Sequence, residues 1–200
     1  AKRKGIPVFH MEAWNRCYSD EVPEEINRRI IDSVSEYLLP YTQRSREQLL
    51  REGYHPSKII VTWNPISEIV SIYLQNIQER IIKEDYVLVT LHRQENIINE
   101  KKLKGIALWL NEISKQYKVI LSVHPKLKDM VAKFQIKFEK NVELSKPFSF
   151  KKFLNLEKYA KCVLSDSGTV PEECCILKTP CVQLRTTTER PELLENNSMI

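Results

Sequence analysis

The sequence predicts an α/β fold in which parallel strands alternate with helices. Short runs rich in Val, Ile and Leu recur along the chain, and such continuously apolar runs are typical of strands buried on both faces. Between them lie longer stretches in which apolar residues repeat every three or four positions, which is the spacing of amphipathic helices. Strands that alternate with helices in this way form parallel sheets with helices on both faces.

Seven apolar runs are predicted to be strands, and helical patterns separate several of them. The predicted strands are residues 6–10, 59–62, 86–91, 119–123, 142–144, 162–164 and 181–184. The clearest helical spacings lie within 26–38, 66–83 and 103–117.

The helix predicted at 66–83 is long and ends in the polar turn Lys83-Glu84-Asp85, so we interpret it as a connection between two domains. We expect the remainder of an N-terminal domain at 1–66, a connecting helix at 67–84 and a C-terminal domain at 85–200. In open α/β sheets, ligands bind beyond the carboxyl ends of the strands, so polar residues at those positions are the candidates for a site.

Composition excludes several classes of protein. The chain has 200 residues, of which 42% are hydrophobic and 28% charged, as in soluble globular proteins that bury a sizeable core. The net charge of +5 is spread over short basic clusters, so we expect no nucleic-acid partner. No apolar run approaches the length of a membrane span and no signal peptide is evident, so we expect no membrane partner. The five cysteines form no C-x-x-C pair, which argues against a disulfide framework or a zinc site and indicates a reducing cytosol.

Polar side chains stand at the ends of several predicted strands. These strand ends read His10-Met11-Glu12, His92-Arg93-Gln94-Glu95-Asn96, His124-Pro125-Lys126 and Ser165-Asp166-Ser167-Gly168-Thr169. Three of the four histidines occupy such positions. We therefore expect these residues to line a shared cleft, where folds of this class place their sites.

The turn at 167–169 has the features of a phosphate-binding site. It leads into a predicted helix with Pro171 in its first turn, where the missing N–H of proline costs little. Backbone N–H groups and the positive end of the helix attract an anion. Glu172 and Glu173, one turn further, offer acceptors for sugar hydroxyls. An ordinary capped helix has the same pattern, but Arg190 downstream favours a diphosphate because guanidinium binds phosphate oxygens in pairs.

Two glutamates open the helix that follows Val22-Pro23. Glutamates in a first turn ordinarily complement the helix dipole. For Glu25 this explanation and a role in the site are equally good. Glu24 stands beside Glu12 if the loop 13–22 folds back. Two such carboxylates with a nearby histidine can share proton transfer when their environments separate their pKa values.

Five motifs in a fixed order give the chain a family resemblance. They are His10-Met11-Glu12-Ala13, Pro23-Glu24-Glu25-Ile26-Asn27-Arg28, His92-Arg93-Gln94-Glu95-Asn96, Ser165-Asp166-Ser167-Gly168-Thr169 and Glu189-Arg190-Pro191-Glu192. The chain resembles the non-hydrolysing UDP-N-acetylglucosamine 2-epimerase family over essentially all of its residues, yet it spans only a little over half of a complete member. The first part of the N-terminal domain and the closing C-terminal helices have no counterpart, so it resembles a partial chain.

The resemblance implies two facing Rossmann-like domains of the glycosyltransferase-B type, the N-terminal one incomplete. It implies interconversion of UDP-GlcNAc and UDP-ManNAc, or of a related UDP-N-acetylhexosamine, by elimination and re-addition of UDP. No metal and no other cofactor is required. The resemblance further implies a cytoplasmic homodimer that serves polysaccharide biosynthesis. The motif around His10 is also similar to the branch that acts on UDP-linked deoxy sugars, such as the route to UDP-N-acetyl-L-fucosamine.

The same motifs assign roles to individual residues by resemblance. The implied catalytic residues are Glu12, Glu24 and His92, and the implied substrate-binding residues are Arg93, Ser167, Gly168, Thr169, Glu173 and Arg190. Of these, the turn residues are implied to contact phosphate and Glu173 the ribose. The family's catalytic aspartate belongs to the part without a counterpart, so the resemblance alone does not imply activity for these 200 residues by themselves.

Two tryptophans depart from the family pattern, since Trp14 and Trp63 stand where the family has glycine. A glycine at a strand end often provides a positive φ or a close backbone approach. We therefore expect the Trp14 indole to displace the loop that carries Arg16 and to impair catalysis. Two alternatives stay open: a non-catalytic nucleotide-sugar-binding remnant, and a glycosyltransferase of the same architecture, which would not exchange the C2 hydrogen of its donor with solvent.

Overall fold

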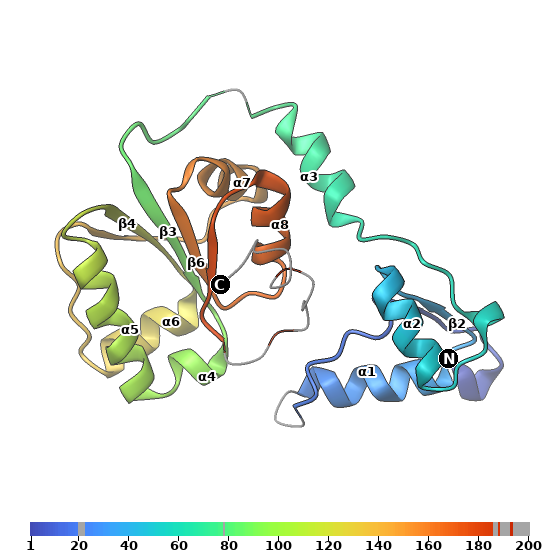
Figure 1. Cartoon of the computed structure of the whole chain (residues 1–200). Helices are drawn as coiled ribbons and strands as arrows, with labels where there is room; N and C mark the ends of the chain where they lie inside the picture. Colours follow the sequence, from blue (N-terminus) through green and yellow to red (C-terminus); the bar gives the residue numbers. More distant parts are fainter. Residues whose placement is uncertain (20–22, 78, 186–187, 189–192, 194–200) are drawn as a thin grey trace. The chain divides into compact units, whose positions relative to one another are not determined.

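The computed structural model describes residues 1–19, 23–77, 79–185, 188 and 193 (Figure 1). The chain divides into two compact units, Ala1–Pro65 and Ile66–Arg185. Each unit contains a parallel sheet, which confirms the predicted α/β class.

The first unit is built on two short parallel strands, β1 (Phe9–Met11) and β2 (Tyr37–Leu39). The helix α1 (Pro23–Val34) connects them, and α2 (Gln43–Arg51) follows. Two 3-10 turns, η1 (Lys2–Lys4) and η2 (Pro56–Lys58), lie outside this core. Its buried apolar residues are Ala13, Trp14, Leu38, Leu49 and Ile59.

Two predictions in this unit are wrong. Tyr37 and Leu38 fit the helical spacing of 26–38, but they form β2, because Glu36 and Tyr37 donate their backbone N–H groups to the Val8 carbonyl and bring the chain into register with β1. The run 59–62, predicted as a strand, forms an isolated bridge between Leu38 and Ile59 and one further backbone bond, from the Thr62 N–H to the Pro40 carbonyl at 3.0 Å, but no regular strand.

The second unit contains a five-stranded parallel sheet in the order β5-β4-β3-β6-β7. Its strands are β3 (Tyr86–Leu91), β4 (Lys118–Val123), β5 (Val142–Ser145), β6 (Cys162–Ser165) and β7 (Cys181–Gln183), which confirms the five apolar runs predicted in this region. Its helices are α3 (Ile66–Leu74), α4 (Gln94–Ile97), α5 (Glu100–Ile113), α6 (Pro125–Lys133), α7 (Phe150–Tyr159) and α8 (Val170–Leu177). The central strand β3 pairs in parallel with both β4 and β6, so their carboxyl ends lie side by side.

Alternate residues of β3 face two separate cores, as expected of a strand buried on both sides. Val87, Val89 and Leu91 pack with side chains of α5 and α6. Tyr86 and Leu88 pack on the other face with side chains of α7 and α8. This burial on both faces is what made the strand readable as a continuous apolar run.

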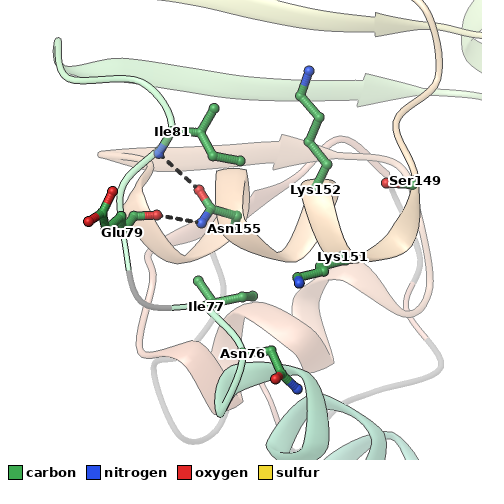
Figure 2. Close-up of a pocket in the computed structure, with 8 residues that line it drawn as sticks. All are labelled: Asn76, Ile77, Glu79, Ile81, Ser149, Lys151, Lys152 and Asn155. Carbon is green, nitrogen blue, oxygen red and sulfur yellow. Dashed lines mark hydrogen bonds between the residues drawn. The ribbon is translucent and has the colours of Figure 1, made fainter.

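The helix α3 ends at Leu74, nine residues before the end predicted from its spacing. The segment that follows is not helical, and Asn155 of α7 binds its backbone: Asn155 donates Nδ2 to the Glu79 carbonyl at 2.8 Å and accepts from the Ile81 N–H at 3.3 Å (Figure 2). Apolar spacing continues through Ile77 and Ile81, but a buried amide side chain replaces the helical hydrogen bonds there. The cavity beside Asn155 contains none of the predicted site residues.

Candidate functional site

The carboxyl ends of β3 and β6 bring two of the predicted motifs together. His92 and Arg93 follow β3, and Arg93 is the N-cap of α4. Asp166 follows β6 directly and is fully buried. The predicted grouping of the motifs 92–96 and 165–169 is therefore present within the second unit.

Asp166 is the centre of this grouping. Its carboxylate accepts hydrogen bonds from the backbone N–H groups of His92 at 3.0 Å and Arg93 at 2.9 Å. It also accepts from Asn96 Nδ2 at 3.1 Å and lies 2.9 Å from His92 Nδ1. Asn96 donates in addition to the Leu184 carbonyl at 2.9 Å, beyond the end of β7. One buried carboxylate thus fixes the turn between β3 and α4.

The pKa of Asp166 reflects these contacts. Burial by itself would raise it, but hydrogen bonds from the side chain and backbone of His92 and from the backbone of Arg93 outweigh burial and lower the pKa below its usual value. Asp166 is therefore ionised at neutral pH and acts only as an acceptor.

The predicted phosphate turn follows at once. Ser167 Oγ accepts from the Thr169 N–H at 3.2 Å, and Ser165 Oγ accepts from the Ser167 N–H at 3.0 Å. Thr169 is exposed and is the N-cap of α8, with Pro171 in the first turn as predicted. A Cβ added at Gly168 would meet nothing within 4 Å, so open space lies beside the turn.

Glu173, which is predicted to accept from the ribose of the substrate, lies deeper in the protein than the turn at 167–169. Glu173 is 5% exposed, and its charge acts on Glu157, which is fully buried on α7 and whose carboxyl oxygens have no hydrogen-bond partner within the described residues. Burial first, and then the charge of Glu173, raise the pKa of Glu157 to about 10. Burial also raises the pKa of Glu173. Two buried carboxyls that act on each other cannot both be ionised at little cost, so the pair retains a proton on Glu157.

This retained proton predicts that the stability of the second unit falls as pH rises. The pKa of Glu157 is about 10 in the folded state, whereas an unperturbed glutamate has a pKa of 4.5. Between these two pH values the folded chain therefore retains a proton that the unfolded chain has released. Stability should then decrease by up to about 1.4 kcal/mol per pH unit. Urea unfolding between pH 6 and 9 measures the slope. Glu157→Gln should flatten it and the exposed control Glu139→Gln should not; equal slopes in both would show that the pair holds no proton.

The candidate residues of the first unit lie around β1 and α1. Glu12 follows β1, has a positive φ of 62° and accepts a hydrogen bond from Asn15 Nδ2. Glu24 is exposed in the first turn of α1. Glu25, by contrast, is buried and accepts from the Cys17 N–H at 2.8 Å, so it holds the loop after Glu12 rather than merely complementing the helix dipole. Glu12 and Glu24 belong to the first unit and His92 to the second.

A second buried aspartate organises this loop. Asp32 on α1 lies 2.5 Å from His10 Nδ1 and 2.6 Å from an Arg16 guanidinium nitrogen, and it also accepts from the Trp14 N–H at 3.3 Å. Burial would lower the pKa of Arg16, but the hydrogen bonds and charges of Asp32 and Glu52 raise it overall. His10 therefore lies at the end of a strand and also contacts the cluster of Asp32 and Arg16.

The loop that follows Trp14 is packed: Arg16 is 4% exposed and bound to Asp32 and Glu52. That the indole displaces this loop and impairs catalysis stays a prediction. Trp14 is itself a core residue, and its Nε1 donates to Glu52 at 2.8 Å. The positive φ inferred from the family glycines is present, at 59° for Trp14 and 63° for Trp63. The indole turns into the core.

Sequence reasoning passed over both organising aspartates. Asp166 belongs to the motif 165–169, in which only the serine, glycine and threonine were assigned to phosphate binding. The role of Asp166 itself becomes evident from its burial in the structure. Asp32 gave no signal, because a single aspartate within an amphipathic helix usually faces solvent. Arg190 lies outside the described residues. Within the described part of the chain, no helix is long and apolar enough to span a membrane, and no three His, Cys, Asp or Glu side chains are grouped to hold a metal ion.

Comparisons with known proteins agree with the site. The UDP-N-acetylglucosamine 2-epimerase family model matches residues 1–200. The UDP-N-acetylglucosamine 2-epimerase of Methanocaldococcus jannaschii is 40% identical over 98% of this chain and 58% of the relative. The UDP-2,3-diacetamido-2,3-dideoxy-D-glucuronate 2-epimerase of Pseudomonas aeruginosa is 30% identical over 97% of this chain and 56% of the relative. The chain thus spans somewhat more than half the length of these relatives.

Solved structures give the same result. The crystal structure of the M. jannaschii UDP-GlcNAc 2-epimerase with UDP-GlcNAc and UDP superposes with a TM-score of 0.91 at 37% identity, covering 100% of this chain and 59% of that one. The Neisseria meningitidis UDP-GlcNAc 2-epimerase bound to UDP-GlcNAc gives 0.88 at 30% identity, covering 100% and 58%. These relatives have the glycosyltransferase-B type of fold that the sequence predicted. With the family model matched from end to end, the chain belongs to the UDP-N-acetylglucosamine 2-epimerase family.

Proposed function

We propose that the protein containing this chain is a UDP-N-acetylhexosamine 2-epimerase that interconverts UDP-GlcNAc and UDP-ManNAc. The observation that carries the proposal is the Asp166 carboxylate, which ties the motif of His92 and Arg93 to the turn at 167–169 through hydrogen bonds of 2.9–3.2 Å. A candidate catalytic imidazole and a candidate diphosphate site are thereby held on one rigid sheet edge, where ligands of α/β proteins bind. The family membership and the UDP-GlcNAc-bound relatives support this substrate class.

The proposed reaction is an elimination followed by an addition. A base removes the proton from C2 of the hexosamine, the C1–O bond breaks, and UDP departs with the bonding electron pair, leaving a C1=C2 double bond. Protonation of C2 on the opposite face and return of UDP to C1 then give the epimer. Atoms and electrons balance without an external oxidant, reductant or water.

The residue roles in this proposal follow the motifs. Glu12, Glu24 and His92 serve proton transfer, and the substrate is bound by Arg93, Ser167, Gly168, Thr169, Glu173 and Arg190. The exposed Thr169 and the open space beside Gly168 support diphosphate binding at this turn. The same proposal includes a homodimer, a cytoplasmic location and a role in polysaccharide biosynthesis. It also includes a domain division at 1–66, 67–84 and 85–200.

Solvent exchange tests the reaction. The full-length protein is incubated with UDP-GlcNAc in heavy water and followed by NMR. Epimerisation is expected to place deuterium at C2 and to produce the UDP-ManNAc anomeric signal. Sugar transfer without C2 exchange would indicate the glycosyltransferase alternative, and UDP binding with neither outcome would indicate the binding remnant. UDP-2,3-diacetamido-2,3-dideoxy-D-glucuronate is the second substrate to test, because a relative of 30% identity is named for it.

Glu173 offers a direct test of the UDP site. Glu173→Ala is expected to weaken UDP binding by about 1–3 kcal/mol if the carboxyl accepts from ribose hydroxyls. Isothermal titration calorimetry with UDP measures the loss. The variant Glu139→Ala, which replaces an exposed glutamate of the same unit, is the control and should bind as the parent does. Unchanged affinity in Glu173→Ala would remove this residue from the site and leave it as the structural partner of Glu157.

A further inference from the structure

The contacts of Asp166 extend beyond holding a loop. Among its partners is the Nδ1 atom of His92, at 2.9 Å. We propose that Asp166 is a positioning residue for His92: it keeps a proton on Nδ1 and thereby presents Nε2 as the reactive atom. The catalytic consequence rests on the proposed function, whereas the proton position can be tested without it.

The Asp166 carboxylate is surrounded by hydrogen-bond donors. Oδ1 of Asp166 faces His92 Nδ1 at 2.9 Å and the His92 N–H at 3.0 Å. Oδ2 faces the Arg93 N–H at 2.9 Å and Asn96 Nδ2 at 3.1 Å. A carboxylate can only accept hydrogen bonds, so each of these partners must donate. Nδ1 therefore carries a hydrogen in both the neutral and the cationic imidazole.

The charge of Asp166 makes this arrangement persistent. Its pKa is lowered despite burial, because the donors favour the ionised form. A hydrogen bond to an ionised acceptor is stronger than one between neutral groups. The alternative tautomer would set the Nδ1 lone pair against a buried negative charge.

The surroundings also fix the direction of the ring. The Asp166 N–H reaches the Thr90 carbonyl at 3.4 Å, and the buried Asn96 is anchored a second time at Leu184. Asp166 has no exposed side-chain surface, whereas 45% of the His92 side chain is exposed. The edge of the imidazole that bears Nδ1 thus meets the protein, and Nε2 lies on the edge available to a ligand.

This geometry suits the elimination step. Negative charge develops on the phosphate oxygen when the C1–O bond breaks. A protonated His92 can donate Nε2–H to that oxygen and recover the proton when UDP returns. The ionised Asp166 stabilises the imidazolium that is present before the first event and after the second. Asp166 touches no reacting atom and acts through His92.

The tautomer of His92 is the decisive measurement. Two-bond ¹H–¹⁵N NMR spectra of the labelled chain distinguish Nδ1–H from Nε2–H in a neutral imidazole, and His92→Gln identifies the signal among the four histidines. The parent chain is expected to show Nδ1–H. Asp166→Asn should lose this preference, and Asp129→Asn, which replaces an exposed aspartate of α6, should keep it. An Nε2–H tautomer in the parent chain overturns the proposal even if Asp166→Asn fails to fold.

Turnover supplies the second readout. In the full-length protein, Asp166→Asn is expected to lower kcat about tenfold to a hundredfold, as loss of an orienting partner typically does, with a smaller change in KM. His92→Gln combined with Asp166→Asn should cost no more than His92→Gln alone. Additive losses would overturn the proposal. Absence of turnover in the parent protein would contradict the proposed function while the tautomer result still decides the role of Asp166.

Discussion

Replacing Asp32 with alanine is expected to lower the free energy of unfolding of residues 1–65 by about 3–5 kcal/mol, because the change leaves a buried charge without its partner. The guanidinium of Arg16 lies 2.6 Å from Asp32, and its side chain is only 2% exposed. Glu52, at 3.1 Å, is a third exposed and compensates only in part. The Trp14 N–H would also lose its acceptor.

Urea denaturation followed by circular dichroism measures this loss. The control Glu47→Ala removes an exposed carboxylate from α2 of the same unit and should change stability by less than about 0.5 kcal/mol. Asp32→Ala combined with Arg16→Met removes both buried charges and should recover much of the stability. If Asp32→Ala costs no more than Glu47→Ala does, the ionic cluster contributes nothing to the fold of this unit.

Trp14→Gly is expected to lower the free energy of unfolding, whereas Trp63→Gly is not. Trp14 is 6% exposed in the core with Leu38 and Leu49, so its removal should cost about 3–5 kcal/mol, offset by about 1–2 kcal/mol from relief of its positive φ. Trp63 is 63% exposed with a φ of 63°, so glycine there loses little packing and relieves the same strain. Trp63→Gly should leave stability unchanged or raise it by about 1 kcal/mol.

The two variants are compared by thermal and urea unfolding, and each serves as the control for the other. A loss in both would show that Trp63 packs in solution. Stability gained in Trp14→Gly would support the expectation that the Trp14 indole displaces the loop that carries Arg16. The structure also changes the catalytic expectation, because restoring glycine at position 14 removes core packing that the Arg16 loop depends on.

The extent to which the sequence predicted this molecule depends on the range of the interactions. β3 and β4 were recognisable because burial on both faces leaves a continuous apolar run. The end of α3 was not, because Ile77 and Ile81 continue the helical spacing while Asn155, more than seventy residues away, captures the backbone. Tyr37 and Leu38 satisfied a helical pattern that pairing with β1 overrides.

The candidate site was predicted in part for the same reason. His92 and the turn at 167–169 were recognisable because strand ends and a helix-opening turn leave local signals. The pairing of Glu157 with Glu173 and of Asp32 with Arg16 depends on burial of side chains from different elements, which spacing does not reveal. A carboxylate in the sequence is usually a solvated one, and only the fold distinguishes the exceptions.

The hydrogen bonds of Asp166 carry a consequence for folding kinetics. Asp166 and His92 are separated by 74 residues along the chain, and Asn96 and Leu184 by 88. Contacts of such long range form only after the large intervening loops have closed, and they therefore belong to the slow part of folding. The chain cannot acquire this arrangement from α4 or α8 alone; β3 and β6 must pair first. Amide exchange at His92 and Arg93 should accordingly become protected among the last signals to appear during refolding.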